Sequence, residues 1–136
     1  MNTYYYDKEF MKTSLYQEFI QNNQGSGNLK IRAYAAREAL PLEGLHIVVS
    51  TKYLDNTIIF FDGYTDSSGM IEKLILPAPV LNQDNLIIPL STNYEIKADD
   101  IMNSIDQKFS VSMYDGVCVV QNINFIPESG VENNVS

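Results

Sequence analysis

The chain has 136 residues, 45% of them hydrophobic, so it is long enough for one domain with a real core and is not disordered overall. Its formal net charge is −8, with only nine Lys and Arg residues. This balance argues against nucleic acid or an anionic membrane surface as a partner, because both require clustered basic side chains. The single cysteine, Cys118, excludes an intrachain disulfide and a Cys-rich zinc site, and we expect no cofactor.

The first residues, "MNTYYYDKEFMKTS", carry no basic segment followed by an apolar one, so they do not have the pattern of a signal peptide. No apolar run approaches the length of a membrane span. We therefore expect a protein that is made and kept inside the cell.

Residues 7–22 have apolar side chains at helical spacing and predict an amphipathic helix, with Asp7 as its N-cap. The apolar positions are Phe10, Met11, Leu15, Phe19 and Ile20, with Tyr16 beside them. The stretch "NNQGSGN" (22–28) ends this helix in a short flexible joint. A four-turn helix is marginal alone in water, so its apolar face should pack on its own domain or dock to a second chain.

From residue 28 onward the apolar residues alternate with a period of two, which predicts strands. The predicted strands cover residues 28–36, 45–53, 57–65, 70–78, 93–99, 108–114 and 117–127. Pro79 and Pro89 interrupt an extended segment that would suit an edge or a crossover. Asp115-Gly116 predicts a hairpin between the last two strands.

Seven strands with turn signals about every ten residues predict a mainly β fold: an antiparallel Greek-key sandwich with an N-terminal amphipathic helix. We expect three segments: the helix in residues 1–24, the β-sandwich in residues 27–127 and a disordered polar tail in residues 128–136.

The order of the segments "LKIRAYAAREALPLEG", "GYTDSSGMIEKLILPAP", "YEIKAD" and "FSVSMYDGVCVVQNINFIP" resembles a prealbumin-like sandwich of the carboxypeptidase regulatory type. It is also similar to the B-type repeats of collagen-binding adhesins. More narrowly, it resembles small domains of Gram-positive bacteria that accompany peptidoglycan-binding and spore cortex-lytic proteins. The resemblance covers residues 27–127 and leaves out the N-terminal helix.

This resemblance implies that "TDSSG" (65–69) is a hairpin rather than a working loop. Asp66 can bond the backbone across the turn, and Gly69 can adopt a positive φ. The adhesin likeness also raises an internal Lys–Asn isopeptide bond, for which Lys30 with Asn122 or Asn124 are the candidates. We do not expect that bond, because strand alternation turns Lys30 away from the core.

Catalytic chemistry has little support in the sequence. The one histidine, His46, lies on a predicted strand among apolar residues, and no G-x-S-x-G motif is present. A relative of prealbumin that hydrolyses a purine-breakdown product uses several histidines and a "YRGS"-like end, and this chain has neither. Cys118 lies in an apolar run and is expected to be a buried small hydrophobe. We therefore predict that the protein is not an enzyme.

An accessory binding or structural module is the expected function, and the resemblance places it around peptidoglycan or spore and cell-envelope assembly. The expected partner is a protein or a cell-wall polymer, and the location is cytoplasmic or envelope-associated. The alternative is a self-assembling coat or phage-tail-like component that forms a homo-oligomer through the helix. A cell-wall enzyme ranks last. Tyr is favoured at interfaces, and the candidate interaction surface is Tyr4, Tyr5, Tyr6, Phe10, Met11, Leu15 and Phe19.

Overall fold

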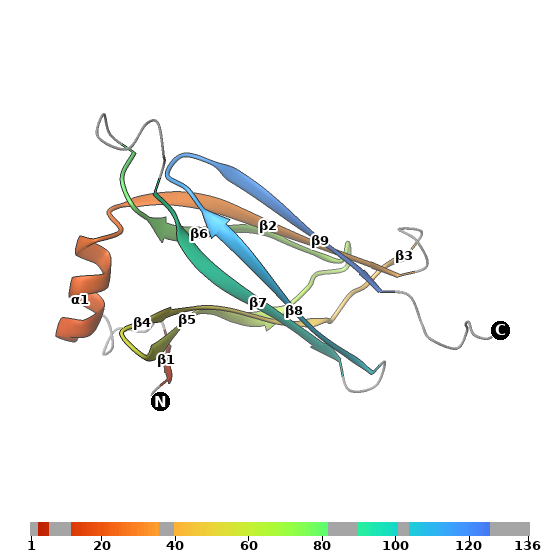
Figure 1. Ribbon diagram of the computed structural model, residues 1–136. Helices are drawn as coiled ribbons and strands as arrows, with labels where there is room; N and C mark the ends of the chain where they lie inside the picture. The colour runs from red at the N-terminus through yellow and green to blue at the C-terminus, as the bar shows by residue number, and fades with distance from the viewer. Residues whose placement is uncertain (1–2, 6–11, 36–39, 82–89, 101–103, 126–136) are drawn as a thin grey trace.

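A computed structural model describes residues 3–5, 12–35, 40–81, 90–100 and 104–125, and these form two β-sheets and one short helix (Figure 1). The fold is mainly β, as predicted. The elements in chain order are β1 (Thr3–Tyr5), α1 (Ser14–Gln21), β2 (Gly25–Ala35), β3 (Leu40–Pro41), β4 (His46–Tyr53), β5 (Asn56–Tyr64), β6 (Met70–Ala78), β7 (Thr92–Asp100), β8 (Ile105–Met113) and β9 (Cys118–Phe125).

The larger sheet has five strands in the order β1-β5-β4-β7-β8. β4 lies at its centre and pairs antiparallel with β5 and β7, which brings segments distant in sequence onto one surface. A register shift between Val49 and Ser50 marks a bulge against β5. The short strand β1 adds to β5 in parallel.

The smaller sheet is built around β2. β6 and the two-residue β3 pair antiparallel with β2, while β9 pairs parallel with it along eight residues. The first long strand and the last strand are therefore neighbours. The prediction of seven strands is wrong, since the described residues contain nine, and the Greek-key connection stays a prediction.

The core lies between the two sheets, because each strand turns alternate side chains inward. In β7, for example, Tyr94, Ile96 and Ala98 are fully buried while the residues between them are exposed. Tyr94 keeps its hydroxyl bonded by donating to the carbonyl of Pro77 at 2.6 Å. That contact ties the larger sheet to the smaller one.

The helix α1 is shorter than predicted. Thr13 is its N-cap and accepts a hydrogen bond from the Tyr16 amide at 3.3 Å, whereas Asp7, Phe10 and Met11 lie outside the described residues. Tyr16 and Phe19 are buried with Ile58 of β5 in a second apolar cluster. The helix therefore packs on its own sandwich.

The chain after the helix also differs from the prediction. Gly25 to Gly27 belong to β2 rather than to a flexible joint. A Cβ on Gly27 would lie 2.7 Å from the carbonyl oxygen of Tyr114. Glycine is needed there because the turn between β8 and β9 approaches the β2 backbone closely.

The "TDSSG" segment is a turn held by Asp66, as predicted. One carboxylate oxygen accepts from the amides of Ser68 at 2.8 Å and Met70 at 3.0 Å, and Gly69 has a φ of +74°. It is not a hairpin, however, because β5 and β6 belong to different sheets.

The Asp115-Gly116 hairpin is also corrected, since β8 lies in the larger sheet and β9 in the smaller one. The carboxylate of Asp115 instead accepts from the amides of Ser26 and Leu81, both at 3.1 Å. This aspartate fixes the turn against the start of β2 and against the residues just after β6.

Candidate functional site

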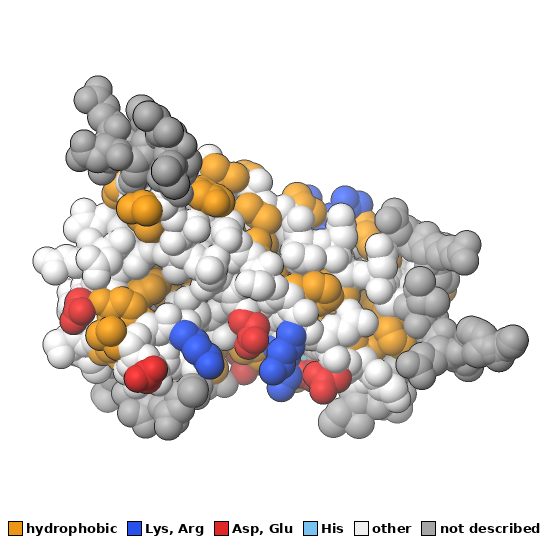
Figure 2. Space-filling view, in the orientation of Figure 1, with side chains coloured by type: hydrophobic (Ala, Val, Ile, Leu, Met, Phe, Trp, Pro, Cys, Tyr) orange, Lys and Arg blue, Asp and Glu red, His pale blue; other side chains and the backbone are white. Residues whose placement is uncertain are grey.

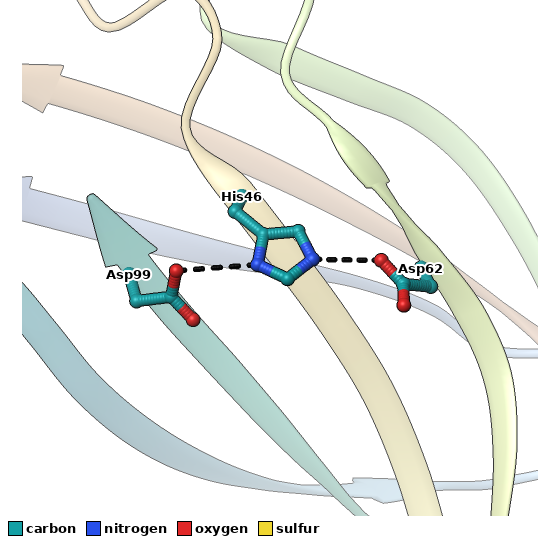
Figure 3. A network of polar contacts seen from close by, with 3 residues as sticks. All are labelled: His46, Asp62 and Asp99. Atoms are coloured by element: carbon teal, nitrogen blue, oxygen red, sulfur yellow. Dashed lines mark hydrogen bonds and ion pairs between the residues drawn. The ribbon is translucent and has the colours of Figure 1, made fainter. Parts of the chain in front are cut away.

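His46 lies at the centre of a three-residue polar network on the outer face of the larger sheet (Figure 3). Its Nε2 is 2.7 Å from Oδ1 of Asp62 on β5, and its Nδ1 is 3.2 Å from Oδ1 of Asp99 on β7. The ring of Tyr64 covers the imidazole with a centroid distance of 5.2 Å. Strand pairing explains the arrangement, because His46 is directly opposite both Asp99 and Tyr64.

The two carboxylates stabilise the charged imidazole. A neutral histidine has one N–H and can donate to only one of them, whereas the imidazolium donates to both. The hydrogen bond to Asp62 raises the pKa of His46 most, Asp99 adds to the rise, and partial burial opposes it. The network therefore favours a protonated histidine that ties β4, β5 and β7 together.

Raising the pH should weaken this network. An unfolded histidine has a pKa near 6.5 and the folded one is higher, so the stabilisation is complete below about pH 6.5 and is lost as the pH rises through the folded value. Between pH 6 and pH 9 the wild-type chain should lose about 0.5–1 kcal/mol more unfolding free energy than His46→Gln, the scale of partly exposed ion pairs. Urea unfolding at several pH values measures this difference.

Lys97→Gln is the matched control for that experiment. It removes an exposed cation from the same sheet face, on β7, without removing the histidine. Its unfolding free energy should follow the wild-type pH dependence. Equal pH dependence in His46→Gln and the wild type would show that the histidine is not held as described.

The network has no free base for catalysis as it stands, because both ring nitrogens of His46 face carboxylates. A Ser–His–acid arrangement needs one nitrogen directed at a nucleophile. Among the described residues, no group of three or more His, Cys, Asp or Glu side chains is arranged to hold a metal ion. The clearest chemical property of this site is a charge that depends on pH.

A groove of about 750 Å³ lies where the C-terminal end of α1 meets the larger sheet. Most of the residues that line it have polar side chains, with Lys52 and Lys108 as cations and Glu95 as an anion, but apolar atoms make up more of its surface than polar atoms. Tyr53 forms part of one wall, and its hydroxyl donates to Glu18 at 2.7 Å. The rest of the lining includes Asn22, Asn23, Ser50, Thr51, Thr57, Asn93 and Ser110.

The groove brings together residues that the sequence did not single out. Ser50 pairs with Glu95 across β4 and β7, and Glu95 pairs with Ser110 across β7 and β8. Their positions on one face follow from strand register, which periodicity alone cannot supply. Figure 2 shows red and blue side chains interspersed along the lower part of this view.

The predicted interaction surface is divided by the structure. Phe19 is only 1% exposed and packs against Tyr53 and Phe60, so it is not available to a partner. Leu15 is half-buried against the same cluster. Tyr4 and Tyr5 belong to β1, and Tyr6 lies outside the described residues, as do Phe10 and Met11.

Cys118 is exposed, which corrects the prediction of a buried residue. It starts β9 at the rim of the smaller sheet and points to the outer side, where Asn28 Nδ2 lies 3.7 Å from its sulfur.

Lys30 is half-buried and paired with Val120, whereas Asn122 and Asn124 are opposite Arg32 and Tyr34. Neither asparagine is the register partner of Lys30.

Comparison with known proteins identifies no family for this chain. No protein-family model matches it, and no curated protein does either. Among solved structures it is similar to 5-hydroxyisourate hydrolase of Klebsiella pneumoniae, with 14% identity and a TM-score of 0.49. The match covers 74% of this chain and 90% of the hydrolase.

No helix in the described part of the chain has the length and hydropathy of a membrane span.

The prediction that the protein is not an enzyme is corrected by this comparison, because the matched structure is an enzyme. The match does not transfer that enzyme's activity to this chain, since fold similarity at such low identity does not carry function. Assays of this protein should therefore include a test for turnover.

Proposed function

We propose that this protein is a binding module for an extended polar ligand of the cell envelope, with peptidoglycan as the first candidate. The observation that carries the proposal is the groove beside α1. It offers hydroxyl, amide, ammonium and carboxylate groups together with an aromatic wall at Tyr53. Binding sites for polar ligands combine a few placed hydrogen-bonding groups with apolar or aromatic contact area.

The charges in the groove suit a ligand that has both carboxylates and amines. Lys52 and Lys108 can pair with carboxylates of a peptide stem, and Glu95 can pair with an amine. Sugar hydroxyls can bond Ser50, Asn93 and Ser110. The link to the envelope of Gram-positive bacteria or spores rests on the sequence resemblance described above.

Pelleting with insoluble peptidoglycan sacculi tests the proposal. The wild-type chain should pellet saturably, and Lys52→Ala with Lys108→Ala should weaken binding about tenfold or more, as expected when about 1.4 kcal/mol of ligand contact is lost. Lys73→Ala is the control, because Lys73 is an exposed cation on β6 of the other sheet. It should bind like the wild type.

The same samples separate the alternatives. Soluble fragments released into the supernatant would identify a cell-wall enzyme. An absence of pelleting, or equal binding by the double variant and the wild type, would contradict this use of the groove.

A further inference from the structure

The strand β9 forms an edge of the smaller sheet (Figure 1). One side of it pairs with β2, from Asn28 opposite Cys118 to Ala35 opposite Phe125. Within the described residues no strand pairs with its other side. Among the described strands, none pairs with the backbone donors and acceptors on that side, and another strand can complete this pattern.

This edge lacks the protection that natural edge strands usually carry. Its sequence, "CVVQNINF", contains no charged residue and no proline, and its pairing with β2 shows no register shift. By contrast, the edge strand β8 of the larger sheet carries Asp106 and Lys108, and β6 carries Lys73 and Pro77. Charges, prolines and bulges are the devices that prevent unwanted strand pairing.

Exposed apolar side chains flank the same edge. Val120 on β9 is 49% exposed, Val117 just before β9 is 43% exposed, and Ile75 on β6 is 55% exposed. These three residues lie in one region around Asn28 of β2. Asn28 is the register partner of Ile75 on one side and of Cys118 on the other. Its backbone amide donates to the carbonyl of Val117. Figure 2 shows hydrophobic side chains along the upper part of the view, away from the acidic side chains below.

The local charge favours a second copy of this chain as the partner. Two chains that each carry a net charge of −8 repel one another over most of their surfaces. Near β9 the repulsion is least, because the strand is uncharged and its neighbour β2 contributes only the cations Lys30 and Arg32. An edge also fits its own copy, since a two-fold axis places identical strands antiparallel.

We propose that β9 pairs antiparallel with β9 of a second copy, so that the two smaller sheets join into one continuous sheet across a two-fold axis. This surface differs from the groove and from the helix. A chain that cannot dimerise through β9 should therefore still be able to bind through the groove.

Light scattering of the full chain over a range of concentrations tests the proposal. The wild type should move from the mass of one chain to that of two as its concentration rises. Val120→Lys with Asn122→Lys should weaken this association at least tenfold, because both positions are exposed on β9 and lysines on an edge oppose pairing. Leu54→Lys with Leu90→Lys adds the same two charges at exposed positions beside strands of the larger sheet and should leave the association unchanged.

Hydrogen exchange provides a second measurement that does not depend on the variants. Amides of β9 that do not face β2 should become protected as the concentration rises, and amides of β8 should not. A single-chain mass at every concentration would overturn the proposal. So would a dimer that the β9 lysines leave intact while the variant keeps the wild-type circular dichroism spectrum.

Discussion

Phe19→Ala is expected to lower the free energy of unfolding by about 3–5 kcal/mol, the range for removing a buried phenylalanine. Phe19 is the most deeply buried residue of α1, with 1% of its surface exposed. Its ring packs edge-on against Tyr53 at 5.4 Å and tilted against Phe60 at 5.8 Å. Alanine would leave a cavity over Ile58, which is fully buried.

Phe19→Ala should also weaken interactions other than those of the Phe19 ring, because hydrogen bonds connect the C-terminal end of α1 to the larger sheet. Asn23 Nδ2 donates to the carbonyl of Phe19 at 2.8 Å, and Asn23 in turn accepts from the hydroxyl of Thr92 on β7. Urea unfolding measures the effect, with Gln21→Ala as the control on the exposed side of the helix. A loss below about 1 kcal/mol for Phe19→Ala would show that α1 does not depend on this docking.

Gly69→Ala should destabilise the fold by about 2–5 kcal/mol. Two costs combine: alanine at a φ of +74° is strained by about 1–2 kcal/mol, and forcing atoms into a packed site typically adds 1–3 kcal/mol. The added Cβ would lie 2.5 Å from the carbonyl oxygen of Ala33 and 2.9 Å from the amide nitrogen of Leu42. Both are backbone atoms, so they cannot rotate away as a side chain can.

Gly116→Ala separates the two costs. Gly116 has nearly the same φ, +77°, but within the described part of the chain no atom beyond its two neighbours in sequence lies within 4 Å of an added Cβ. It should therefore show only the conformational strain, about 1–2 kcal/mol. Equal losses at Gly69 and Gly116 in chemical denaturation would mean that the close approach of Ala33 and Leu42 contributes nothing.

The sequence predicted the elements better than their arrangement. Alternation located all seven long strands, and β6 has the predicted bounds of Met70 and Ala78. The turns at Asp66 and Asp115 were recognised, but both were predicted as hairpins. Local turn chemistry fixes the backbone of a few residues and does not determine whether the next strand joins the same sheet.

The candidate site was beyond sequence reasoning for a related reason. His46 meets Asp62, 16 residues away, and Asp99, 53 residues away, because β4 pairs with both β5 and β7. The residue types were visible, but the register that joins them was not. Cys118 was misplaced because an apolar run at the rim of a sheet resembles one in the core.

The parallel pairing of β2 with β9 also shapes how the chain must fold. Asn28 and Cys118 are adjacent across the sheet but 90 residues apart in sequence. Closing such a long loop is slow, because its entropy is lost before the contacts form. During synthesis the smaller sheet stays incomplete until the last strand has been made. Until then β2 has an open edge and its apolar side chains lack one neighbour, so this is the stage at which the nascent chain is most prone to aggregate.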